Sequence, residues 1–293
     1  MSLSIFVVAP NSNQVSAFRA LDGEPAGSKA IPLASNRLLM DGRRIVAWER
    51  RGGEGGELFA IDPLTGDRVW SHEFKGEART SLIDASEIAL LDPSGRFVVL
   101  GALDGSPRID ADVGRIEPLE SIGVVRSADR YVLITNAPTP GAIRRNQFTG
   151  NQWSRPQTAN GPVWAFDRQT GKALWAARVE GQSFDMSQPE DLPVLTFAAY
   201  SYSPQGVGAG MVGQFMTVNL IDARNGQKIF EEKFTSSLVP HRFRVSLADK
   251  TIGIDFLGTS HGFEVRPTDA PLPSANLPST ARKSAVPLDP TPQ

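Results

Sequence analysis

A short pattern recurs along the chain and limits its fold more than any other feature does. Residues 60–70 read AIDPLTGDRVW and residues 165–175 read AFDRQTGKALW, so both copies follow Ala, any residue, Asp, two residues, Thr-Gly, three residues and Trp. A weaker copy at residues 220–230, LIDARNGQKIF, keeps the Asp, the Gly and a final aromatic residue. Units that return at such intervals predict a repeat architecture in which neighbouring units share a core.

Each copy predicts a strand, a tight turn and a second strand. The apolar and β-branched runs before the turns, such as residues 163–166 and 217–221, favour half-buried strands. The Gly permits the positive φ of a tight reversal, and the Asp can accept backbone N–H groups. The aromatic residue four positions later is expected to cover the flank of the neighbouring unit. The residues assigned to structural docking are Asp62, Thr65, Gly66, Trp70, Asp167, Thr170, Gly171, Trp175, Asp222, Gly226 and Phe230.

Two more degenerate copies give anchoring glycines at positions 23, 66, 105, 171 and 226, separated by 43, 39, 66 and 55 residues. The first two intervals match the roughly 40–45 residues of a four-stranded propeller blade, and the longer two indicate blades with loop insertions. A sixth unit is expected within residues 243–265, and no segment has sustained helical periodicity. The sequence therefore predicts an all-β propeller of four-stranded blades, with about six repeat units, either whole or as part of a larger propeller.

The pattern resembles the tryptophan-docking repeat of PQQ-like, or quinoprotein-type, β-propellers. The resemblance covers residues 4–266 as an architecture and is most specific around Trp70 and Trp175. It implies a radial array of four-stranded sheets with Trp residues packed between blades. It does not imply one activity, because the members of this group include both cofactor-bearing alcohol dehydrogenases and non-enzymatic bacterial scaffolds. One of these scaffolds is a lipoprotein of the outer-membrane assembly machinery.

The resemblance favours the non-enzymatic members. The enzymes of the group share a pair of adjacent cysteines, a Glu/Asn/Asp set that holds Ca²⁺ and an aspartate base. This chain has no Cys, and its carboxylates match no such motif. We therefore expect no catalytic residue, no metal ligand and no cofactor. The alternative hypothesis is a PQQ- and Ca²⁺-dependent or carbohydrate-handling enzyme with its site at the central channel.

Composition narrows the classes of partner. The 293 residues carry 30 basic and 32 acidic side chains, a net charge of −2, which favours neither nucleic acid nor an anionic membrane surface. No run of 18 apolar residues predicts a membrane span, and without Cys there is no disulfide or thiolate site. These observations leave an unidentified protein as the expected partner.

The chain is expected to divide into a propeller at residues 1–266 and a disordered, Pro-rich tail at residues 267–293. Seven of the 28 residues from Arg266 to Gln293 are proline and none is aromatic, so this segment buries too little surface to offset ordering. The N-terminal residues do not form an export signal. We expect the chain to be the C-terminal part of a longer exported, periplasmic protein, in which it could have a purely structural role.

The interval between residues 136 and 161 is the most distinctive insertion. Long connections without a strand or helix are usually functional or disordered, and Arg and Trp are enriched at binding hot spots. The alternative interpretation is a polar insertion with an incidental Trp. A second loop, at residues 201–214, is expected on the adjacent blade. The sequence thus favours a protein-interaction module whose candidate partner-binding residues are Arg144, Arg145, Trp153 and Arg155.

Three other features carry no predicted chemistry. Residues 208–213 match G-x-G-x-x-G, but strand-forming residues follow them where dinucleotide binding needs a helix. The histidines at positions 72, 241 and 261 lack the spacing of metal ligands and are expected in loops or turns. Asp110 and Asp112 lack the further ligands of a calcium loop and are expected to be solvated at a turn.

Overall fold

The described residues of the chain form an all-β structure, as the sequence predicts. They comprise 21 strands and no helix, and every strand pairing among them is antiparallel. The computed structural model describes residues 4–8, 14–30, 36–41, 44–51, 55–62, 65–116, 118–138, 156–185, 188, 192–203, 213–235, 241–246, 251–256 and 259–264.

The strands group into six consecutive units. Unit 1 contains β1 (Ser4–Val8), β2 (Gln14–Arg19) and β3 (Pro25–Ala30). Unit 2 contains β4 (Asn36–Asp41), β5 (Arg44–Arg50), β6 (Gly55–Ile61) and β7 (Arg68–Lys75). Unit 3 contains β8 (Arg79–Leu82), β9 (Glu87–Leu91), β10 (Arg96–Gly101) and β11 (Pro107–Asp112).

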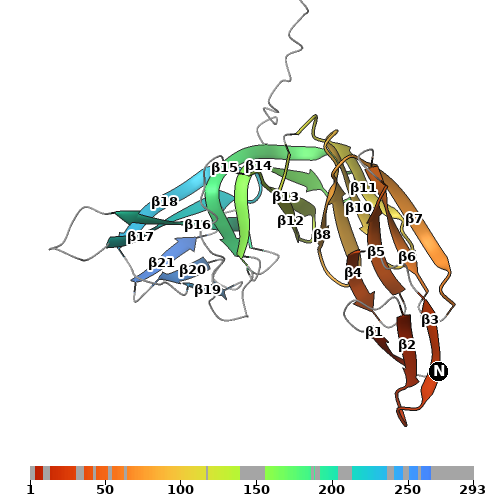
Figure 1. The fold of residues 1–293 in the computed structure, drawn as a ribbon. Helices are drawn as coiled ribbons and strands as arrows, with labels where there is room; N and C mark the ends of the chain where they lie inside the picture. Colours follow the sequence, from red (N-terminus) through yellow and green to blue (C-terminus); the bar gives the residue numbers. More distant parts are fainter. Residues whose placement is uncertain are drawn as a thin grey trace, which may run out of the picture.

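The second half of the chain continues this arrangement, and Figure 1 shows the units following one another in chain order along an arc. Unit 4 contains β12 (Ser121–Arg126), β13 (Arg130–Asn136), β14 (Pro156–Asp167) and β15 (Ala173–Asp185). Unit 5 contains β16 (Val194–Ser203), β17 (Gly213–Asp222) and β18 (Lys228–Thr235). Unit 6 contains β19 (His241–Ser246), β20 (Thr251–Phe256) and β21 (Thr259–Glu264).

The same type of glycine turn connects the last two strands of each of units 1 to 5. The φ angles of the five anchoring glycines lie between 67° and 77°, a region that residues with a Cβ rarely adopt. In each turn the glycine N–H donates to the carbonyl four residues earlier, over 2.8 to 2.9 Å. The positive φ predicted from the repeat is therefore confirmed at Gly23, Gly66, Gly105, Gly171 and Gly226.

The central sheets are buried on both faces. All seven residues of β6 are buried. Since successive side chains along a strand point to opposite faces, both faces of the sheet must be covered at β6. Leu58 and Ala60 pack towards unit 3, whereas Phe59 and Ile61 belong to a different cluster, with Ile45 and Ala47. Each of these units thus contributes to two cores, which explains the runs of apolar residues in their middle strands.

Each junction between two central units has its own core. The junction of units 3 and 4 includes an aromatic pair, Phe97 and Phe166, whose ring centroids lie 5.0 Å apart. Buried residues at the junction of units 2 and 3 are Val46, Leu58, Ala60, Phe74, Ala78, Ile88, Leu90, Val98, Leu100 and Ala102. Those at the junction of units 4 and 5 include Val132, Ile134, Val163, Trp175, Val179, Phe184, Leu195, Phe197 and Ile221.

Units 4 and 5 are joined into one seven-stranded sheet, a link that the repeat pattern does not predict. β15 has 13 residues and turns a corner at Gly181, where φ is 59°. Beyond this corner, Ser183 and Phe184 pair with β14 on one side and with Ala198 and Phe197 of β16 on the other. The end of β15 therefore supplies unit 5 with its first strand.

The antiparallel order gives every four-stranded unit two distinct ends. At the turn end, the connection between the first two strands lies beside the glycine turn, as the bond from Ala102 N to Ser86 O shows. At the loop end, the connection between the second and third strands lies beside the link to the next unit, as the bond from Val113 N to Gly95 O shows.

Candidate functional site

Trp70 and Trp175 each contact the glycine turn of the next unit. Trp70 Nε1 donates to Ala102 O over 3.1 Å, and Trp175 Nε1 donates to Ala223 O over 2.9 Å. A Cβ on Gly105 would lie 2.6 Å from Cγ of Trp70, and a Cβ on Gly226 would lie 2.6 Å from Cε3 of Trp175. The absence of a side chain on each glycine therefore makes room for the indole of the preceding unit.

Ile109 lies at the corresponding place in unit 3. It follows Gly105 by four residues, as Trp70 follows Gly66, and a Cβ on Gly171 would lie 3.4 Å from Cβ of Ile109. Ile109 is buried, but its side chain has no N–H that could donate to the next turn. The repeat pattern does not indicate Ile109, because the pattern has an aromatic residue at this position, although the spacing from Gly105 identifies the position.

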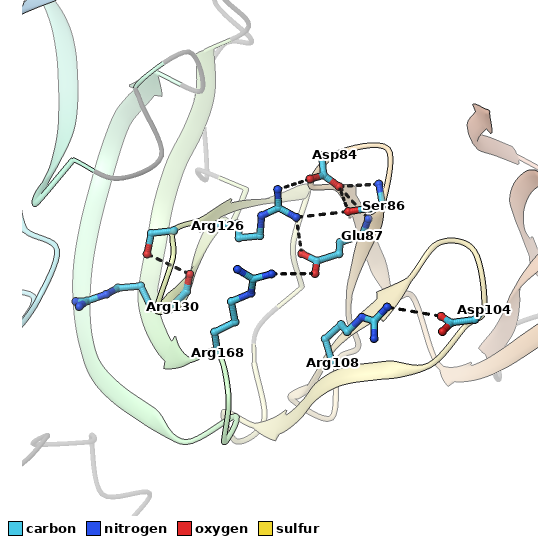
Figure 2. Close-up of polar contacts among 9 residues, drawn as sticks. Asp84, Ser86, Glu87, Asp104, Arg108, Arg126, Arg130 and Arg168 are labelled. Carbon is cyan, nitrogen blue, oxygen red and sulfur yellow. Dashed lines mark hydrogen bonds and ion pairs between the residues drawn. The ribbon is translucent and has the colours of Figure 1, made fainter. Parts of the chain in front are cut away.

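A charged cluster lies at the same junction of units 3 and 4 (Figure 2). Glu87 at the start of β9 has only 6% of its side chain exposed. Its carboxylate lies 3.2 Å from Nη1 of Arg126 and 3.7 Å from Nη2 of Arg168. Arg126 ends β12 and Arg168 lies in the β14–β15 turn, so unit 4 supplies both cations and unit 3 supplies the anion.

Asp84 extends the cluster at the turn end. It lies 2.5 Å from Nη2 of Arg126, and its Oδ1 accepts the backbone N–H groups of Ser86 and Glu87 over 2.7 and 3.0 Å. Burial alone would raise the pKa of Asp84, but the hydrogen bonds from Ser86 and the charge of Arg126 outweigh it and hold the pKa below its ordinary value. Asp84 therefore remains ionised and fixes both the turn and Arg126.

Tyr131 lies beneath this cluster. Its ring is fully buried, and Cζ of Arg168 lies 5.8 Å from the ring centroid. Burial raises the pKa of the Tyr131 hydroxyl, and the neighbouring Glu87 raises it further. The hydroxyl therefore stays neutral. The one sequence signal that could have indicated the cluster is Glu87, an acidic residue at the start of the otherwise apolar strand at residues 87–91.

The Asp and Thr residues of the repeat close their own turns. Asp167 Oδ1 accepts the N–H and the Oγ1–H of Thr170, both over 2.7 Å. These bonds hold the pKa of Asp167 below its ordinary value. Asp62 accepts from Thr65 N over 3.3 Å, and Asp222 accepts from Arg224 N over 2.8 Å. The structure places Phe230 on β18, half-buried, opposite Leu220 of β17.

The predicted insertion is partly strand, which corrects the expectation of a connection without secondary structure. β13 ends at Asn136, and β14 begins at Pro156, so the last residues of the interval belong to a strand. The register of β14 on β15 continues to Pro156, and this pairing explains the difference. The candidate partner-binding residues Arg144, Arg145, Trp153 and Arg155 lie outside the described residues.

Hydrogen bonds fix the base of this connection at the loop end of unit 4. Asn160 Nδ2 donates to Ala137 O over 2.8 Å, while Ala137 N donates to Asn160 O over 2.7 Å. Asn160 Oδ1 also accepts from Gly181 N over 3.2 Å. Asn136 Nδ2 donates to Ser121 Oγ over 3.4 Å. This asparagine clamp holds together the two strands from which the connection leaves.

The loop end also carries a groove between units 2 and 3. Its volume is about 520 Å³, and its charged lining comes from Arg51, Glu73, Lys75, Asp92 and Arg96. Arg51 lies 2.6 Å from Glu57 and 3.2 Å from Glu73. The groove therefore presents paired charges of both signs.

Glu57 gives this region a pH dependence. Its side chain is buried and contacts Arg51 and Arg68. Burial alone would raise the pKa of Glu57, but bonding to Arg68 and the charges of Arg68 and Arg51 outweigh it, so the pKa lies below its ordinary value of 4.5. The resulting stabilisation is complete above the ordinary pKa and is lost as the pH falls through the lower, folded-state pKa.

We expect Glu57→Gln to flatten the acid side of the stability profile. Melting temperatures followed by circular dichroism from neutral pH to below about pH 4 should fall less in the variant than in the unchanged protein. Glu73→Gln is the matched control, because Glu73 also contacts Arg51 but is 78% exposed. Parallel profiles for the Glu57 variant and the unchanged protein would contradict the assignment.

Two predictions about polar residues are wrong. His72 lies within β7, His241 begins β19 and His261 lies within β21, so all three histidines belong to strands rather than turns. Asp110 and Asp112 lie on β11, where Asp110 pairs with Arg96 over 2.6 Å. The hydrogen bond from Arg96 lowers the pKa of Asp110. Cross-strand pairing, which spacing along the sequence does not show, places these residues.

Among the residues that the structure describes, no group of three or more His, Asp or Glu side chains could hold a metal ion. None of the described segments is a helix long and apolar enough to cross a membrane.

Comparison with known proteins identifies the family. BamB from Moraxella catarrhalis is 14% identical over 89% of this chain and 70% of that one, with a TM-score of 0.35. A europium-containing methanol dehydrogenase is 10% identical over 90% of this chain and 68% of that one, with a TM-score of 0.44. Neither likeness is close enough to indicate a function, and no curated protein sequence matches. The profile of the family described as outer membrane protein assembly factor BamB matches residues 3–159, more than half of the chain, which therefore belongs to this PQQ-like β-propeller family.

Proposed function

We propose that this chain is a non-catalytic propeller scaffold that binds a protein partner through the loop end of unit 4. The asparagine clamp carries the proposal, because it holds both ends of the connection at residues 139–155 in a fixed place. A connection of this length on a rigid base is a common arrangement for binding residues. Membership of a family described by an assembly factor supports a role in a multiprotein complex.

The chemistry of the connection indicates the kind of partner surface. Arg144, Arg145 and Arg155 can each bind a carboxylate through two parallel hydrogen bonds, and Trp153 can bury a large apolar area. We therefore propose a partner surface that combines acidic side chains with an apolar pocket. The β16–β17 connection of the adjacent unit leaves from the same end and would border this surface.

We propose the same division of the chain that the sequence predicts. Residues 1–266 would form the propeller, and residues 267–293 would be a Pro-rich tail without a fixed structure. The tail lies outside the described residues. An exported, periplasmic parent protein would fit a role in assembly at the outer membrane, as the family description suggests.

The triple variant Arg144→Ala, Arg145→Ala and Trp153→Ala tests the proposal. Because truncation of a hot-spot residue weakens binding by at least about 2 kcal/mol, partner recovery in a quantitative pull-down should fall by more than about tenfold. Its melting temperature should stay close to that of the unchanged protein, because the variant changes none of the described residues of the junction cores.

The matched control is the triple variant Arg19→Ala, Arg108→Ala and Arg178→Ala. These arginines are exposed, by 51%, 47% and 66% of their side chains, and lie on β2, β11 and β15. The control should recover the partners unchanged. If the first variant left every recovered partner at its original level, the connection would not be the binding surface.

A further inference from the structure

His72 lies within the packed face of β7 at the junction of units 2 and 3. It alternates along the strand with Trp70 and Phe74, so the three side chains point to the same face. His72 is paired with Leu58 of β6, and Leu58 belongs to the core that unit 2 shares with unit 3. A titratable side chain therefore stands in the middle of a face that unit 3 covers.

The fold does not require a histidine at this position. His72 follows its anchoring glycine by six residues, and at the same distance from their glycines units 3 and 4 have Ala111 and Ala177. Both alanines pack against the cores of their own junctions. Among these three units, the ionisable side chain is thus a particular property of the junction of units 2 and 3.

One ring nitrogen of His72 has no partner. Nε2 is buried and has no hydrogen-bond partner among the described residues. A neutral imidazole can carry its proton on Nδ1 and leave Nε2 bare, whereas an imidazolium carries an N–H on both nitrogens. Protonation would therefore place a charged N–H group in the junction without an acceptor. Such a buried, unpaired donor is unfavourable.

The charged groups that act on His72 do not remove this penalty. They are Arg96 of β10 and Asp110 of β11, and both oxygens of Asp110 already accept from Arg96, over 3.0 and 2.6 Å. Burial lowers the pKa of His72, and the charge of Arg96 lowers it further. The charge of Asp110 raises it by less, so the pKa lies below its ordinary value of 6.5.

We propose that His72 makes the junction of units 2 and 3 sensitive to pH, because the neutral imidazole packs within the junction and the imidazolium loosens it. Phe74 and Arg96 also line the groove at the loop end of this junction, so loosening would change the shape of that groove. This response goes beyond the proposed interaction role and shares no residue with the connection at residues 139–155.

The response falls in a defined pH range. Because the folded-state pKa of His72 is lowered, an opened junction takes up the proton before a closed one does as the pH falls. The closed junction is fully favoured above pH 6.5 and weakens from there down to the folded-state pKa. One proton changes the opening equilibrium by at most about tenfold for each pH unit. The Glu57 effect begins only below 4.5, so the two ranges are separate.

Hydrogen exchange of two indole N–H groups tests the proposal. Trp70 Nε1 donates to Ala102 O across the junction of units 2 and 3, and Trp175 Nε1 donates to Ala223 O across the junction of units 4 and 5. Nuclear magnetic resonance of the full chain gives both protection factors, corrected for the intrinsic exchange rate at each pH. From about pH 7.5 to about pH 5, protection of Trp70 should fall relative to that of Trp175, by up to about tenfold per pH unit below 6.5.

Three variants assign the effect. His72→Ala introduces the residue that units 3 and 4 have at this position and should make the ratio of the two protection factors independent of pH. His72→Gln, which is neutral, should do the same and serves if the alanine variant does not fold. His261→Gln is the matched control, because it removes a histidine from unit 6 and should leave the pH dependence unchanged.

Four results would overturn the proposal. One is a ratio that stays constant with pH in the unchanged protein. Another is a titration of the His72 ring signals at or above pH 6.5, which would mean that the junction does not disfavour the imidazolium. A third is that both His72 variants fold and keep the pH dependence. The last is that His261→Gln abolishes the dependence, which would assign it to another histidine.

Discussion

Replacing Trp175 by alanine should lower the free energy of unfolding by about 3–5 kcal/mol, the effect of removing a large aromatic side chain from a core. Trp175 is 3% exposed, belongs to the core between units 4 and 5, and donates to Ala223 O. Its loss opens a cavity and leaves a turn carbonyl without that donor. Urea unfolding followed by circular dichroism measures the effect.

Trp175→Phe separates packing from hydrogen bonding. This variant keeps a ring against Gly226 but removes the indole N–H. The loss in the free energy of unfolding should therefore shrink to about 1 kcal/mol, the contribution of one hydrogen bond, plus a small amount for the lost contact area. Trp70 is less buried than Trp175, and Trp70→Ala should be milder. A Trp175→Ala change within about 0.5 kcal/mol of zero would mean that the indole does not hold the units together.

Glu87→Gln should lower the free energy of unfolding by about 2 kcal/mol. Removing one partner of a fully buried ion pair costs about 3–5 kcal/mol, because the other charge remains without compensation. Here Arg126 and Arg168 are 21% and 38% exposed, so water takes over part of the lost interaction. The same urea experiment gives the value, with folding checked by near-ultraviolet circular dichroism.

Asp104→Asn is the matched control, and Figure 2 shows both pairs. Asp104 lies 3.9 Å from Arg108, and both side chains are about half exposed, at 55% and 47%. An exposed pair of this kind contributes at most about 1 kcal/mol, so the control should be nearly neutral. Equal effects at Glu87 and Asp104 would show that burial at the junction does not strengthen the Glu87 cluster.

The glycine turns and their neighbours could be predicted from the sequence because they are local. A Gly at positive φ, an Asp that accepts from Thr and an aromatic residue four positions later all lie within eleven residues. Ile109 shows where this stops. The position follows the spacing, but the residue type does not, and in this junction the aromatic packing comes from Phe97 and Phe166 of the same core.

The rest of the site depends on contacts between distant residues. Glu87 meets Arg126 and Arg168 only because units 3 and 4 face each other, and these partners lie 39 and 81 residues further along the chain. The sequence alone does not show which strands face each other, so it cannot distinguish these residues from ordinary polar residues of the surface.

The shared strand β15 has a consequence for how this protein can be divided. Because Ser183 and Phe184 pair with both β14 and β16, unit 5 takes its register from unit 4. Deleting one residue after Gly181 would turn the Phe184 side chain to the opposite face of the sheet and disturb the pairing of β15 with both β14 and β16. Units 4 and 5 therefore cannot be separated within β15 without breaking this pairing, and we expect a division point that preserves folding to lie before β12 or after β18.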